Sequence, residues 1–129
     1  MTKREEMEHL ITRSEEFMET AIYQLEKGFH ALAVFNSEEA LKLFLKAKLL
    51  EKGVTYPRTH SVRSLMEILS DLTKTKKRDQ INDFLEENLI EPGALEDAYI
   101  TSRYVIREYK KREAEILFKV VKEIIENVI

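Results

Sequence analysis

The segment Tyr99-Ile100-Thr101-Ser102-Arg103-Tyr104 concentrates residue types that suit chemistry, and Arg107 follows one helical turn after Arg103. Residues four apart lie on one side of a helix, so Tyr99, Arg103 and Arg107 form a row. Guanidinium groups bind phosphate with two hydrogen bonds and also stack on aromatic bases. The row predicts a nucleotide- or RNA-binding surface. The structural alternative, in which these arginines only pair with carboxylates of the chain, stays open.

The segment Tyr56-Pro57-Arg58-Thr59-His60-Ser61 is the second candidate for a binding site. Its Pro57 prevents a preceding helix from resuming at once. In the simpler interpretation this is a turn, in which Arg58 and His60 stabilise the start of the next helix. In the functional interpretation the same two side chains bind a nucleotide or a partner protein.

Composition excludes several classes of site. The chain of 129 residues has no cysteine, which excludes disulfides and thiolate metal sites. Its three histidines, His9, His30 and His60, are scattered, and no glycine-rich phosphate loop or nucleophile elbow occurs. The sequence therefore predicts no metal site and no cofactor.

Charge and hydropathy predict a cytoplasmic protein. The formal net charge of −3 gives no general attraction to nucleic acid or to anionic membranes. Apolar runs are short and interrupted by charge, so no segment is expected to cross a membrane. The N-terminal residues MTKREEMEHL lack the apolar core of a secretion signal. Abundant Lys and Glu also fit a heat-adapted source.

A long helix between Phe29 and Gly53 is expected to be the central element, because it is apolar on most sides. One face carries Leu32, Ala33, Asn36, Ala40, Leu43, Phe44, Ala47 and Leu50, and a second carries Val34, Leu41, Leu45 and Leu49, with Glu38 inside it. Only Glu39, Lys42 and Lys46 are expected to face water. Because a buried carboxylate needs a cation, we expect Arg103 to lie near the turn Asn36 to Glu39.

Helical spacing of apolar residues also marks the rest of the chain. A helix over residues 3–27 is predicted, with Thr2 as N-cap and Gly28 as the break that makes a helical hairpin. Thr59 or Ser61 caps the next helix, and a further one ends at Pro92-Gly93. The final stretch is one helix, or two broken near residues 107–110. We therefore predict an all-α fold, a single domain over residues 1–129 built as an antiparallel helical bundle of four to five main helices with short connections.

Three segments of the sequence carry a resemblance to a known family. The stretch from Phe35 to Ala47, the turn Pro57 to Ser61 and the segment Ala98 to Tyr104 resemble the signature of HEPN domains (higher eukaryote and prokaryote nucleotide-binding). The PRTH turn is the most specific part of the match. The resemblance implies a helical homodimer that pairs with a small nucleotidyltransferase, often as a toxin–antitoxin system. It points to Asn36, Glu39, Arg58, His60, Tyr99, Arg103 and Tyr104 as residues that bind a nucleotide or the partner.

The chain departs from the ribonuclease members of that family, which carry a histidine four to six residues after an arginine. No histidine occurs after His60. RNA cleavage through the 2′-hydroxyl needs a group that exchanges protons near neutral pH, and a tyrosine, with a pKa of about 10, is a poor substitute. A non-enzymatic binding module is therefore the leading hypothesis. The alternatives are a metal-independent ribonuclease toxin, whose degenerate catalytic site is built from Arg103, Arg107 and Tyr109, and a purely structural helical dimer.

Overall fold

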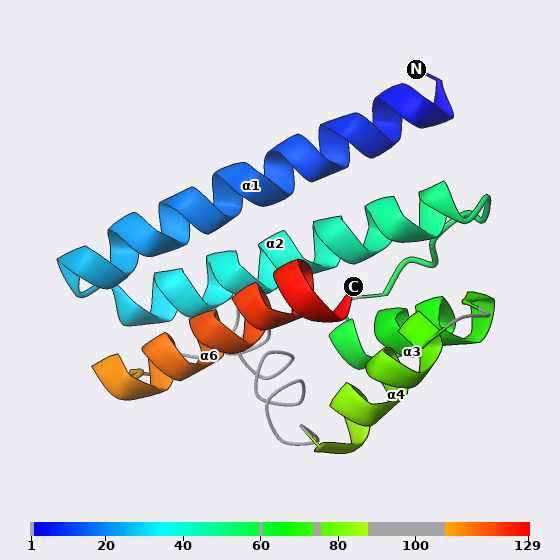
Figure 1. Cartoon of the computed structure of the whole chain (residues 1–129). Coiled ribbons are helices and arrows are strands. Elements are labelled where there is room, and N and C mark those ends of the chain that lie inside the picture. The colour runs from blue at the N-terminus through cyan, green and yellow to red at the C-terminus, as the bar shows by residue number, and fades with distance from the viewer. Residues whose placement is uncertain (1, 60, 74–75, 88–107) are drawn as a thin grey trace.

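A computed structural model of the chain describes residues 2–59, 61–73, 76–87 and 108–129. These residues form helices and no strand, which confirms the predicted all-α bundle (Figure 1). The helices are α1 (Lys3–Lys27), α2 (His30–Glu51), α3 (Val62–Leu72), α4 (Lys76–Glu87) and α6 (Lys111–Glu123), and the π-helical turn η1 (Ile124–Val128) continues α6. The predicted end of a helix at Pro92-Gly93 lies outside the described residues. No helix in the described ranges is long and apolar enough to cross a membrane.

The first two helices form the predicted antiparallel hairpin, and α1 lies along most of α2 (Figure 1). The Thr2 hydroxyl accepts a hydrogen bond from the Glu5 backbone N–H at 3.1 Å, which caps α1. Gly28 ends the helix with a φ of 82°, a left-handed conformation that favours glycine. Between the helices, the buried Ser14 hydroxyl donates to the Ala40 carbonyl at 2.7 Å. The hairpin thus has a defined start, turn and register.

Helix α2 is the central element, as expected. It lies between α1 and α6, and α3 packs against it as well (Figure 1). The second predicted face of α2 faces the main core, where Val34, Leu41, Leu45 and Leu49 are fully buried. The other helices complete that core with Val62, Leu65, Met66, Leu69, Ile81, Leu85, Ala114, Leu117, Val121, Ile124 and Val128.

Three side chains depart from the expected pattern of burial. Helical spacing predicts that Lys42 faces water, but it is only 3% exposed. The same spacing places Leu32 on a buried face of α2 and Ile22 in the apolar stripe of α1, but they are 52% and 45% exposed. The reason is positional: Leu32 lies in the first turn of α2 and Ile22 lies at an open edge of α1, whereas Lys42 lies in the middle of the covered helix.

The turn after α2 follows the prediction in detail. Gly53 has a φ of 86°, and the chain then runs without helix through Val54 to Thr59. The Ser61 hydroxyl accepts from the Ser64 backbone N–H at 3.1 Å and caps α3, while the Thr59 hydroxyl accepts from the Ser61 N–H. Side-chain caps of this kind satisfy backbone donors that a helix start leaves free.

The C-terminal stretch is interrupted at residues 108–110, which are not helical. Lys110 is extended, its N–H donates to the Glu113 carboxylate at 3.1 Å, and α6 begins at Lys111. The Nδ1–H of His30 donates to the Tyr109 carbonyl at 3.1 Å and joins this break to the start of α2. Within the described residues, a helix therefore begins at Lys111 and does not extend back through residues 108–110.

Candidate functional site

Three charged residues in the middle of α2 form a group that we name the α2 charge cluster: Glu38, Glu39 and Lys42. The Lys42 Nζ lies 2.6 Å from Glu39 Oε1 and 3.6 Å from Glu38 Oε2. Glu38 is 0% exposed, in the same stripe as Leu41, Leu45 and Leu49. Among the described residues, neither oxygen of Glu38 accepts a well-formed hydrogen bond. A buried carboxylate with so little compensation is costly for folding.

Burial changes the protonation of Glu38. The loss of water raises the pKa of the Glu38 carboxyl from 4.5 to about 8, and the Glu39 carboxylate adds to the rise while Lys42 opposes it. The low-dielectric surroundings disfavour the charged form, which is the dominant effect for a carboxyl in an apolar stripe. At neutral pH, Glu38 is therefore mostly protonated, and the ion pair in the cluster is that between Lys42 and Glu39.

The cluster continues toward the turn after α2 through Lys46 and Tyr56. The Lys46 Nζ lies 5.3 Å from the centre of the Tyr56 ring, within range of a cation–π contact. Burial lowers the pKa of Lys46, and the Lys42 ammonium adds to this effect. The Tyr56 hydroxyl donates to Glu6 Oε1 at 2.9 Å, and burial together with this carboxylate raises the pKa of Tyr56.

The predicted binding residues of α2 point in two directions. Asn36 donates from Nδ2 to Gln24 Oε1 at 2.8 Å, so it faces α1. Glu39 belongs to the α2 charge cluster and pairs with Lys42. Asn36 and Glu39 therefore contact different partners and do not form one polar cluster. The predicted neighbour Arg103 lies outside the described residues, so its position beside this turn stays a prediction.

Most of the other predicted site residues lie outside the described ranges. These are His60, Tyr99, Arg103, Tyr104 and Arg107. Arg58 is described and exposed on the turn before α3, where it is open to a ligand. Tyr109, a candidate for the ribonuclease hypothesis, is 5% exposed and belongs to the main core. Within the described ranges no group of acidic or histidine side chains is arranged to hold a metal ion.

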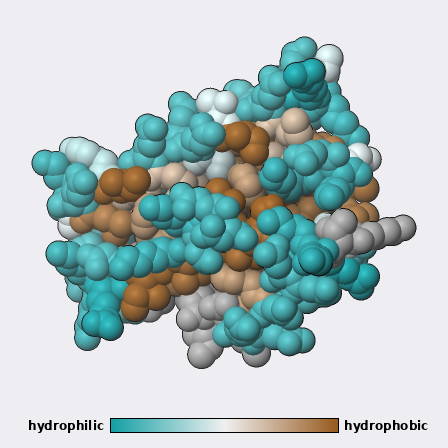
Figure 2. All heavy atoms as spheres, in the orientation of Figure 1, coloured by the Kyte–Doolittle hydropathy of each residue, from teal (hydrophilic) through white to brown (hydrophobic). Residues whose placement is uncertain are grey.

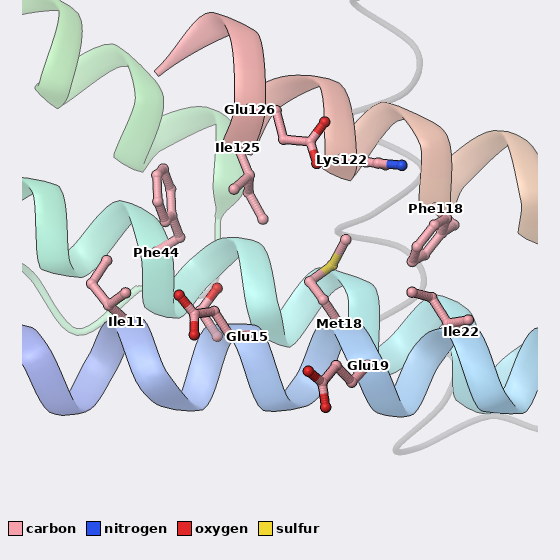
Figure 3. Close-up of a pocket in the computed structure, with 11 residues that line it drawn as sticks. Ile11, Glu15, Met18, Glu19, Ile22, Phe44, Phe118, Lys122, Ile125 and Glu126 are labelled. Atoms are coloured by element: carbon pink, nitrogen blue, oxygen red, sulfur yellow. The ribbon is translucent and has the colours of Figure 1, made fainter.

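A hollow on the described surface, which we name the α1–α6 groove, is not predicted by the sequence. Its volume is about 350 Å³. Helices α1 and α6 with η1 form its walls and α2 its floor, and Figure 3 shows side chains from all three. The lining residues are Ile11, Ser14, Glu15, Met18, Glu19, Ile22, Phe44, Phe118, Lys122, Ile125 and Glu126. Helical spacing assigned Met18 and Ile22 to the core, because an amphipathic stripe looks the same whether another element covers it or not.

Comparison with known proteins identifies the class of fold. The family model described as the HEPN domain matches residues 7–128, nearly the whole chain. The chain therefore belongs to the HEPN domain family, and the resemblance noted from its motifs is confirmed. This membership supports a module with a nucleotide- or RNA-related role. No curated protein and no solved structure gave a match to the chain.

Proposed function

We propose that this chain is a non-enzymatic HEPN binding module that pairs with a small nucleotidyltransferase or binds a nucleotide, in a toxin–antitoxin type of system. The observation that carries the proposal is the combination of family membership with the absence of any histidine after His60. A ribonuclease site of this family would need that proton-exchanging group. Without it, binding is the function that the remaining residues support best.

The surroundings of Tyr109 favour binding over ribonuclease activity. Of the three residues proposed for a degenerate catalytic site, Arg103 and Arg107 lie outside the described ranges and Tyr109 is buried. A phenol held in the core has no path to a 2′-hydroxyl of RNA. Incubation of metal-free protein with structured RNA tests this alternative, with Arg103→Ala as control. Cleavage that Arg103→Ala abolishes would establish the ribonuclease and overturn the binding-only proposal.

Arg58 is the described residue on which the binding proposal is tested. It is exposed on the PRTH turn, next to a helix whose start is already capped by Ser61, so the cap does not need its side chain. A guanidinium on a fixed turn is suited to phosphate or to a carboxylate of a partner. We also propose that the chain forms a homodimer, as expected for a member of the family.

The experiment is co-purification with a small nucleotidyltransferase from the source organism, together with calorimetric titration of ATP. Arg58→Ala should weaken the interaction by about tenfold or more, as expected for a charge-assisted hydrogen bond. Arg112→Ala is the matched control, because Arg112 is an exposed arginine at the first turn of α6, away from the PRTH turn. Equal binding by both variants, or no binding of either ligand to the unaltered protein, would refute the proposal.

A further inference from the structure

The α1–α6 groove combines an apolar interior with an acidic border. Ile11, Met18, Phe44, Phe118 and Ile125 supply apolar surface, and Ile22 at one end is 45% exposed. Figure 2 shows hydrophobic atoms in the band between α1 and α6, with hydrophilic atoms along both sides. Apolar surface that stays open on a folded domain, bordered by polar residues, is typical of an interaction site.

The border of the groove carries three carboxylates, Glu15, Glu19 and Glu126, and one ammonium group, Lys122. All four residues are exposed. Within the described residues none of the three carboxylates takes part in an ion pair. Their charges are therefore available to a cationic partner, and they repel an anionic surface such as a membrane or nucleic acid.

The walls of the groove determine which kind of backbone can enter it. They are helices, whose backbone groups are already hydrogen-bonded along each helix, so an extended peptide would find no strand edge to pair with. A partner must satisfy its own backbone, which a helix does. From Ile11 to Ile22 the groove follows three turns of α1, roughly 16 Å, enough for anchors spaced three, four and seven residues apart.

From this geometry we propose that the α1–α6 groove binds an amphipathic helix of a partner protein, with apolar anchors in the groove and Lys or Arg residues along both flanks. Packed between α1 and α6, this helix would cover the exposed edge at Ile22 and Phe118, which face each other at one end of the groove (Figure 3). A second copy of the chain is a poor occupant, because a symmetric contact would bring the same three carboxylates against one another. The proposal goes beyond the module role and does not depend on a nucleotidyltransferase as partner.

The test uses two fluorescein-labelled amphipathic peptides of about 15 residues, which share a leucine stripe and differ only in Lys or Glu flanks. Fluorescence anisotropy is measured against the full chain up to about 1 mM, the range of weak groove contacts. The Lys peptide should bind and the Glu peptide should not. Addition of salt should weaken the binding, because the charge contacts lie at the exposed rim.

Paired charge reversals locate the binding. The double variant Glu15→Lys, Glu19→Lys should lower the affinity for the Lys peptide by about tenfold and raise the affinity for the Glu peptide. The matched control is Glu16→Lys with Glu26→Lys, which changes the net charge equally on exposed positions of α1 outside the groove lining, and it should shift affinity by less than about twofold. Circular dichroism checks that each variant keeps its helices.

Three results would overturn the proposal. One is no binding of the Lys peptide to the unaltered chain. Another is an equal loss in both double variants, which would show non-specific attraction to an acidic protein. The third comes from sedimentation: a dimer of the unaltered chain that the groove variant dissociates, but the control does not, would show that a second copy occupies the groove.

Discussion

The α2 charge cluster and the α1–α6 groove depart from the usual pattern of burial in opposite ways: the first buries charged side chains and the second exposes apolar ones. Glu38 and Lys42 are charged types that are 0% and 3% exposed, in the middle of the most covered helix. Ile22 on α1 is an apolar residue that is 45% exposed. Folding alone favours the reverse arrangement in both places.

The comparison separates two kinds of cost. The cluster costs free energy inside the bundle, because a carboxyl loses water without gaining full hydrogen bonding. The groove costs free energy at the surface, because apolar area stays in contact with water until a partner covers it. Such departures concentrate at functional sites in natural proteins. Stability should therefore depend on pH and on each charged member of the cluster. Binding in the groove should depend on substitutions that leave stability unaltered.

The largest effect is expected for Lys42→Met, which keeps the aliphatic stem and removes the ammonium group. Glu39 would then lose its partner at 2.6 Å, and Glu38 its nearest cation. Loss of one member of a buried ion pair should lower the free energy of unfolding by about 3–4 kcal/mol, measured by urea denaturation. Lys48→Met is the matched control on the same helix, where the pair with Glu51 is more exposed, and it should cost less than about 1 kcal/mol. Equal losses in the two variants would show that the buried pair of Lys42 contributes no more to stability than the exposed pair of Lys48.

The next effect concerns Glu38→Gln and the pH. The folded-state pKa of Glu38 is about 8 and its ordinary value is 4.5, so between these values the unfolded chain is ionised while the folded chain keeps the proton. The folded state then binds more protons, and stability falls as pH rises from about 4.5 to 8. Glu38→Gln should remove this slope and stabilise the protein by about 2 kcal/mol at pH 7, because the buried amide offsets part of the gain.

Denaturation midpoints measured at pH 4, 7 and 8.5 decide this prediction. At pH 4, where Glu38 is largely protonated in both states, the variant should be slightly less stable than the unaltered protein, because only the cost of the buried amide remains, and at pH 7 and 8.5 it should be the more stable of the two. Glu87→Gln serves as control, since that carboxylate is exposed at the end of α4. Destabilisation by Glu38→Gln at all three pH values would mean that an ionised Glu38 has a cationic partner, as predicted for Arg103.

A smaller effect is expected for Ser14→Ala, because Ser14 lies between the two regions. It lines the α1–α6 groove, and its hydroxyl donates to the α2 carbonyl of Ala40 at 2.7 Å. Removal of this buried hydrogen bond should cost about 1 kcal/mol by thermal denaturation. Thr20→Ala is the comparison, since that hydroxyl bonds only to its own helix at Glu16 and is exposed. A larger loss for Thr20→Ala would contradict the assigned role of Ser14.

The smallest effect on stability is expected for Ile22→Ser, at the open end of the groove. Because the side chain is already 45% exposed, the melting temperature should shift by no more than corresponds to about 0.5 kcal/mol. Affinity for the basic amphipathic peptide should nevertheless fall. Leu41→Ser at a fully buried site should instead cost about 3 kcal/mol or more. A melting temperature strongly lowered by Ile22→Ser would show that the groove belongs to the core.

Several local features follow from the sequence because they depend on short-range chemistry. Thr2 and Ser61 cap helices, Gly28 and Gly53 take positive φ values, and α2 is buried on most sides, all as predicted. A hydroxyl near a helix start, a glycine at a helix end and the spacing of apolar residues each act within a few residues. The PRTH turn and the segment Ala98 to Tyr104 likewise indicate the HEPN family from sequence alone.

Tertiary structure alone decided which of these faces are covered. The spacing of Lys42 and Ile22 on their helices predicts an exposed lysine and a buried isoleucine, but the neighbouring helices reverse both assignments. A periodic pattern gives the direction of a side chain around its own helix and carries no information about whether another helix arrives there. The pairing of Asn36 with Gln24 and of His30 with Tyr109 depends in the same way on elements distant in the chain. For the same reason the raised pKa of Glu38 and the acidic border of the α1–α6 groove exist only once α1, α2 and α6 have packed together.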